Sequence, residues 1–448
     1  MRGLRSTIAL LVVLIGLGAY IYFVTWKKPT EPASKQEKVF AGIDSSKIEE
    51  LKVASDKGDV TTLKKEGGNW QLVAPLAVKA DESEVSGIAN ALSQLEIVRV
   101  IDENPTNLND YGLMTPRIEI DFKATGDKDF RKLAIGEKSP TGSDLFARRN
   151  DDKKVFLIPS YQETTLNRST FELRDKTVLK FERDKVEGLE VKAGDKSFQV
   201  AKDNTEWKMT QPLQVRADYG TVEGLLGRLQ SAAMKSIATE TASPADLKKY
   251  GLDKPSATVD VKMGSARATL LLGSKAETNT VYARDTSKGS VVTIDSALLD
   301  ELKKTPDDYR RKDVFEFRSY NVNRVEFTRN GETIAFEKMK SDGKDAAEKW
   351  RRISPNAADA DKDKMDSLLN RVSNMRASSF VDSSAKTGLN SPAMTVVAKF
   401  DEGKKEERVT FGKVDNDVYA ARPGEPGAAK VDATDFNEAS KTLDELSK

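Results

Sequence analysis

The feature that most constrains this chain is a block of twelve residues that occurs three times. Residues 70–81 read WQLVAPLAVKAD, residues 207–218 read WKMTQPLQVRAD, and residues 350–361 read WRRISPNAADAD. Each block fits the pattern W-x4-P-x4-A-D, and their starting positions are 137 and 143 residues apart. A period of that length matches a whole domain and is too long for one unit of a solenoid.

Three further landmarks follow each block in the same order. A G-L-x-x-P element begins at Gly112, Gly251 and Gly388 and ends at Pro116, Pro255 and Pro392. Next come a strand-like run ending in Gly136, Gly273 or Gly412 and an aromatic-Ala-Arg run ending in Arg148, Arg284 or Arg422. These landmarks predict a tandem triplication, with copy 1 over residues 39–177, copy 2 over 178–313 and copy 3 over 314–448.

The pattern within each copy predicts an α+β fold. Runs with a period of two stand before each Trp and are separated by turn residues, which indicates antiparallel hairpins. After each Asp, apolar residues recur at +4, +7, +8 and +11, which is one face of a helix. We therefore expect a mostly antiparallel sheet with one main packed helix per copy. Asp81, Asp218 and Asp361 are predicted N-caps, and Glu84 is expected to complete a capping box.

Two interpretations of the repeated residues compete. In the structural one, which we favour, Trp anchors a strand in the core, Pro ends the strand, Asp caps the helix and Gly takes a positive φ. In the functional one, Trp is a stacking platform for a ligand, or a tyrosine before G-L-x-x-P (Tyr111 or Tyr250, replaced by Thr387 in copy 3) binds a ligand. The structural motif residues are Trp70, Pro75, Asp81, Gly112, Pro116, Trp207, Pro212, Asp218, Gly251, Pro255, Trp350, Pro355, Asp361, Gly388 and Pro392.

The composition excludes several kinds of catalytic site. The chain has no Cys and no His, so Ser-His-Asp and Cys-His catalysis and Cys-ligated metal sites are excluded. The acidic run DADKDKMDSLLN at 359–370 resembles a calcium loop but has Lys364 where Gly is needed and Asn370 where Glu is needed. We therefore predict no catalytic, cofactor-binding or metal-binding residues. A hydrolase that uses two carboxylates stays open, because the sequence does not pair any two acids.

The N-terminus reads as a membrane anchor. Residues 8–24, IALLVVLIGLGAYIYFV, form an uncharged run, and Thr25 and Trp26 extend it. As a helix this run is about 25 Å long, close to the thickness of a hydrocarbon core. We expect an anchor within residues 1–27 that contacts lipid through 8–26, followed by a linker over 28–38. The alternative is a cleaved signal peptide, with Gly16 and Gly18 before the cleavage point.

The charge balance disfavours nucleic acid as a partner. The chain has 72 basic and 71 acidic residues, and the basic residues Arg2, Arg5, Lys27 and Lys28 flank the apolar run. Removing these four leaves 68 basic residues against 71 acidic ones, so the rest of the chain is slightly acidic. Binding to a nucleic-acid backbone requires concentrated positive charge.

Together the W-x4-P block, the Y-G-L-x-x-P element, the L-x-x-G strand end and the Y-A-R strand resemble a bacterial domain-of-unknown-function family, number 4340. The resemblance covers about residues 38–448, and copy 3 departs from it at Thr387 and in Y-A-A-R. It implies an inner-membrane protein with periplasmic C-terminal domains, often encoded beside ABC-type transporter components that resemble gliding-motility proteins. We expect a non-enzymatic accessory or scaffold with transporter subunits as partners. The alternatives are a periplasmic glycan- or lipid-binding module and a carboxylate-based hydrolase.

Overall fold

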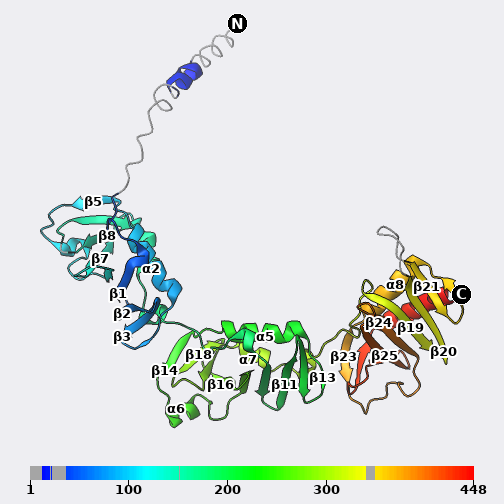
Figure 1. Cartoon of the computed structure of the whole chain (residues 1–448). Helices are drawn as coiled ribbons and strands as arrows, with labels where there is room; N and C mark the ends of the chain where they lie inside the picture. The colour runs from blue at the N-terminus through cyan, green and yellow to red at the C-terminus, as the bar shows by residue number, and fades with distance from the viewer. Residues whose placement is uncertain (1–12, 21, 23–36, 151, 340–348) are drawn as a thin grey trace, which may run out of the picture. The chain divides into compact units, whose positions relative to one another are not determined.

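The described chain contains three antiparallel sheets of nine strands each. The structure is a computed structural model that describes residues 13–20, 22, 37–150, 152–339 and 349–448. The chain divides into two compact units, Met1–Lys176 and Thr177–Lys448. The first unit contains one sheet and the second contains two (Figure 1). All three sheets have the same strand order. Three tandem repeats of a mostly β fold are thereby confirmed.

The strands of the three sheets have the following bounds. Copy 1 contains β1 (Ile48–Ala54), β2 (Val60–Glu66), β3 (Asn69–Ala74), β4 (Val78–Lys79), β5 (Arg99–Asp102), β6 (Ile118–Ala124), β7 (Arg131–Lys138), β8 (Asp144–Arg149) and β9 (Val155–Pro159). Copy 2 contains β10 (Gly188–Ala193), β11 (Lys196–Asp203), β12 (Glu206–Gln211), β13 (Val215–Arg216), β14 (Ser236–Thr239), β15 (Ala257–Met263), β16 (Ala266–Lys275), β17 (Thr280–Asp285) and β18 (Val291–Asp295). Copy 3 contains β19 (Val322–Arg329), β20 (Glu332–Met339), β21 (Lys349–Ser354), β22 (Ala358–Asp359), β23 (Ala377–Val381), β24 (Met394–Phe400), β25 (Lys405–Val414), β26 (Asp417–Ala421) and β27 (Ala428–Val431).

The strand order shows how each sheet is assembled from two halves. In copy 1 the order is β4-β3-β2-β1-β6-β7-β8-β9-β5, so two runs of consecutive hairpins meet where β1 pairs with β6. The helix after β4 leads into β5, which pairs with β9 at the opposite edge of the sheet. The central pairing aligns Leu51 with Phe122 in copy 1 and Val191 with Val259 in copy 2. Each sheet therefore depends on two pairings between segments far apart in sequence, one at its centre and one at an edge.

The hairpins have turns that match their sequences. In copy 3, Arg329 pairs with Glu332 across the two-residue turn Asn330-Gly331, and both turn residues have positive φ, 52° and 83°. Two-residue turns with this geometry favour Asn-Gly because their backbone twist matches that of paired strands. The turn chemistry thus fixes the register between β19 and β20.

A helix of 12 or 13 residues follows the block in every copy: α2 (Glu82–Gln94), α5 (Tyr219–Ser231) and α8 (Lys362–Ser373). The residues at +4, +7, +8 and +11 from the block Asp are buried in all three helices. In copies 1 and 3 they belong to the same hydrophobic core as residues of the sheet.

The remaining helices differ between copies. Copy 1 has α3 (Glu163–Leu166) and α4 (Thr170–Leu173), and copy 2 has α6 (Pro244–Lys249) and α7 (Ala297–Leu302). Copy 3 ends in α9 (Ala433–Ser447), which packs beside α8. The constant parts of the repeat are therefore the sheet and the helix after the block.

The predicted membrane anchor lies mostly outside the described residues. Of residues 8–26, only 13–20 and 22 are described, and residues 13–20 are helical. In the part of the chain that the structure describes, no helix has both the length and the apolar character needed to cross a membrane. The anchor and the linker remain predictions, as do the three domain boundaries.

Candidate functional site

The repeated block forms a compact corner between a strand and a helix. Trp70, Trp207 and Trp350 retain only 3%, 2% and 3% of their accessible surface. Each lies on a strand that ends just before the block proline, and the peptide bonds preceding Pro75, Pro212 and Pro355 are cis. The alanine before the block Asp donates its N–H to the carbonyl of the block Trp, at 3.2, 2.9 and 2.9 Å in the three copies. The chain therefore folds back on the Trp strand before the helix begins.

The block Asp occupies the N-cap of the helix in every copy. Asp81 accepts hydrogen bonds from the N–H groups of Ser83 and Glu84, Asp218 from Thr221, and Asp361 from Lys364. These bonds satisfy amides that lack a partner within the helix. The block Trp and Asp are thus occupied by contacts within their own copy.

The capping box expected in copy 1 is replaced by other contacts. The carboxylate of Glu84 forms an ion pair with Arg168 at 2.9 Å. The N–H of Asp81, which a capping box would bond to Glu84, donates to the carbonyl of Leu173 at 2.8 Å. The neighbouring carboxylate of Glu82 accepts from the backbone N–H of Trp70, at 2.5 Å. The first turn of α2 is therefore tied to the end of copy 1 and to the Trp strand, which are segments that sequence spacing did not connect.

The two glycine landmarks contact each other across each copy. Gly112, Gly251 and Gly388 have φ values of 64°, 69° and 72°. The residues that precede these glycines are Tyr111, Tyr250 and Thr387. A Cβ added at Gly136, Gly273 or Gly412 would lie 2.1–2.2 Å from the carbonyl oxygen of the corresponding one. This backbone approach tolerates no side chain, which explains why both glycines recur. Pro116, Pro255 and Pro392 stand two residues before β6, β15 and β24.

The tyrosines before G-L-x-x-P pack against the aromatic-Ala-Arg strand. The ring of Tyr250 is buried and lies 4.4 Å from that of Tyr282, and the ring of Tyr111 lies 5.1 Å from that of Phe146. The hydroxyl of Tyr111 donates to Asp102 at 3.1 Å. Burial and the Asp102 carboxylate raise the pKa of Tyr111. These contacts give both tyrosines a structural role.

A cationic side chain ties the start of each copy to its last strands. In copy 1, Arg149 donates to the carbonyl of Val39 at 2.7 Å. In copy 2, Lys288 donates to the carbonyl of Val178 at 2.8 Å, and in copy 3, Arg422 donates to that of Val314 at 2.9 Å. Only in copy 3 is this side chain the landmark arginine itself; copy 1 uses the next residue, and copy 2 uses a lysine four residues beyond Arg284.

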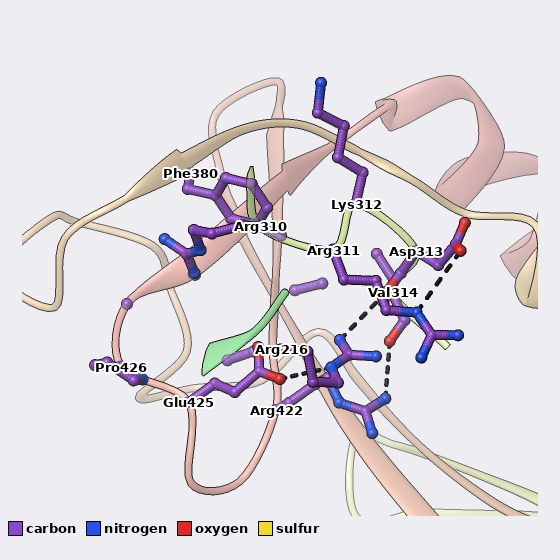
Figure 2. Close-up of a pocket in the computed structure, with 15 residues that line it drawn as sticks. Arg216, Arg310, Arg311, Lys312, Asp313, Val314, Phe380, Arg422, Glu425 and Pro426 are labelled. Atoms are coloured by element: carbon purple, nitrogen blue, oxygen red, sulfur yellow. Dashed lines mark hydrogen bonds and ion pairs between the residues drawn. The ribbon is translucent and has the colours of Figure 1, made fainter. Parts of the chain in front are cut away.

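A cluster of charged side chains lies where copy 2 meets copy 3, and we call it the ionic junction. It consists of Arg216, Glu316, Glu407, Arg422 and Glu425. Figure 2 shows three of them, Arg216, Arg422 and Glu425. Arg216 Nε lies 2.6 Å from Glu425, and Arg422 Nη1 lies 2.5 Å from Glu407. Burial lowers the pKa of Arg216, and the charge of Glu425 opposes that shift only in part.

The space enclosed at the ionic junction is small. Its cavity measures about 20 Å³, which is room for roughly one water molecule. Sequence reasoning missed this cluster, because its members are unremarkable charged residues that only the fold brings together. Among the described residues, no group of three or more metal-ligating side chains could hold a metal ion.

The fold and the repeated corner define a tandem protein built from three β-rich copies. The family model described as "Domain of unknown function (DUF4340)" matches residues 70–208, 207–392 and 350–448. The chain therefore belongs to this family.

Two other comparisons add little. No curated protein matches the chain. A crystal structure of the DNA polymerase sliding clamp from Pseudomonas aeruginosa with ligand aligns with 88% of this chain and 93% of its own, at 9% identity and a TM-score of 0.18. A likeness at that level carries no argument about fold or function.

Proposed function

We propose that this protein is a non-enzymatic scaffold of the bacterial envelope. It is held in the inner membrane by residues 8–26 and extends three β-rich copies into the periplasm. There it acts as an accessory to an ABC-type transport complex, a partner class that follows from the resemblance to its family. The observation that carries the proposal is the threefold repetition of one sheet order in a single chain.

Repeated domains suit a scaffold for a physical reason. Once one copy contacts a partner, the next copy meets that partner at high effective concentration, so weak contacts add up to stable association. The most conspicuous residues of the chain, the block Trp and Asp, are occupied within each copy by core packing and helix capping. Their repetition is accounted for by the fold.

The alternatives have less support. A glycan- or lipid-binding module that stacks its ligand on the block tryptophans needs an exposed indole face, and the three indoles are buried. A carboxylate-based hydrolase needs two acids that face one cleft. The carboxylates of the ionic junction instead pair with arginines.

Crosslinking in native membranes tests the proposal. The full-length chain carries a tag, membranes are treated with an amine-reactive crosslinker, and captured proteins are identified by mass spectrometry. We expect subunits of an ABC-type transporter. An unrelated periplasmic protein on the same anchor is the control and should capture none. Failure to capture a transporter subunit above this control would contradict the scaffold role.

Protease treatment of intact spheroplasts tests the location independently. We expect residues 39–448 to be digested while the membrane stays intact. Protection of this part of the chain until the membrane is permeabilised would place it in the cytoplasm and overturn the topology.

A further inference from the structure

The segment that connects copy 2 to copy 3 is hydrogen-bonded to both copies through its backbone. The N–H of Arg311 donates to the carbonyl of Arg216 in copy 2, at 3.0 Å. The carbonyl of the next residue, Lys312, accepts from Ala377 in copy 3, at 2.7 Å. Consecutive residues are thus bonded to different copies, so no free residue remains between them to act as a hinge.

Arg216 reaches from the edge strand β13 of copy 2 to copy 3. Its guanidinium contacts Glu425 at 2.6 Å, the carbonyl of Asp313 at 3.2 Å and Glu316 at 3.5 Å. The side chain is only 13% exposed. A guanidinium is planar and carries five donors, so several simultaneous contacts fix its orientation.

Copy 3 holds one of the two carboxylates that Arg216 contacts, Glu316, in place through its own side chains. The side chain of Glu407 is 3% exposed, pairs with Arg422 and accepts from the backbone N–H groups of Glu316 and Phe317. Arg422 also contacts the Glu316 carboxylate at 3.3 Å. Charges therefore alternate from Arg216 through Glu316 and Arg422 to Glu407, and Arg216 meets an ordered acidic surface.

An aromatic contact lies beside these ion pairs. Arg310, which bridges to Ala217 in copy 2, places its guanidinium 3.7 Å from the ring centre of Phe380 in copy 3 (Figure 2). Cation–π attraction strengthens when the cation is desolvated, and the side chain of Arg310 is only 6% exposed. Two arginines of copy 2, Arg216 and Arg310, thus contact side chains of copy 3.

We propose that copies 2 and 3 form one rigid body, locked by Arg216 in the ionic junction. Partners then meet these two copies as a single surface with fixed spacing. The inference is independent of the scaffold proposal, because it concerns only contacts within residues 177–448.

Spin-label distances in the full-length chain test the lock. The chain has no cysteine, so Ser265→Cys in copy 2 and Ser384→Cys in copy 3 create the only two labelling sites, both at exposed turn positions. Pulsed electron paramagnetic resonance then gives the distribution of distances between the labels. We expect one narrow peak in the parent chain. Arg216→Ala and Glu425→Gln each remove one partner of the same ion pair. Both variants should replace the narrow peak with a broad distribution.

The matched control is Lys192→Ala, which breaks an ion pair with Glu190 inside copy 2. It should keep the narrow peak, and circular dichroism should show that every variant is folded. Loss of the peak in at least one folded junction variant, with the control unchanged, supports the lock. The proposal is overturned by a broad distribution in the parent chain, by a narrow peak that survives in both junction variants, or by equal broadening in the control.

Discussion

Gly273 lies at the closest backbone approach in copy 2. A Cβ there would be 2.2 Å from the Tyr250 carbonyl oxygen, far inside contact distance. The Tyr250 oxygen belongs to the backbone and cannot move aside as a flexible side chain would. The strand β16, which carries Gly273, would therefore have to shift. The residue therefore has a packing role that its position at the end of a strand-like run did not reveal.

We predict that Gly273→Ala destabilises copy 2 by about 1–3 kcal/mol, the usual cost of overpacking. Gly224→Ala is the control, since Gly224 is exposed within α5 and a Cβ there meets nothing within 4 Å. That change should stabilise α5 by roughly 0.5–1 kcal/mol. Hydrogen exchange of amides in β16 and α5 measures both effects. Equal protection in the two variants would contradict the backbone approach.

The helix after the block is the element whose start was clearest in the sequence. In α5, Asp218 accepts from both the N–H and the hydroxyl of Thr221, at 2.8 and 2.7 Å. We predict that Asp218→Ala destabilises α5 by about 1 kcal/mol, whereas Asp218→Asn costs only a few tenths because its amide oxygen also caps. Amide exchange in the first turn of α5 reports the loss. Similar exchange in both variants would show that the negative charge, and not the cap, stabilises this end.

The whole molecule is expected to be sensitive to acid. Burial alone raises the pKa of Glu223, but hydrogen bonds from Trp207 and Arg183 outweigh it, so the net shift is downward. In the first unit, burial likewise raises the pKa of Glu163, and Arg117 and Lys138 reverse that shift. A carboxyl with a lowered folded pKa contributes stability that is present above its unfolded pKa, about 4.3, and is lost as pH falls through the folded value.

We therefore predict that unfolding free energy is nearly flat from pH 7 to about 5 and falls below the unfolded pKa of Glu. Urea unfolding followed by tryptophan fluorescence at a series of pH values measures this dependence. Glu223→Gln should make the slope shallower in copy 2, because the titrating group is gone. Stability that rises on acidification would contradict the prediction.

Local sequence patterns determined the repeat, the hairpins and the helix after each block. A helix face and an Asn-Gly turn depend on residues within a few positions of each other, so spacing alone identifies them. The same patterns located the glycines of both landmarks but not the contact between them. Nor did they indicate the cis peptide bonds before Pro75, Pro212 and Pro355.

Only the tertiary structure decided which distant segments meet. The pairing of β1 with β6, the approach of Gly273 to Tyr250 and the insertion of Arg216 among Glu316 and Glu425 join residues far apart in sequence. Such contacts depend on the summed packing of a whole sheet, and a charged residue looks the same in sequence whether it ends in solvent or in a buried pair. The sequence by itself determined which segments are repeated, and the tertiary structure decided which distant residues of the repeats contact each other.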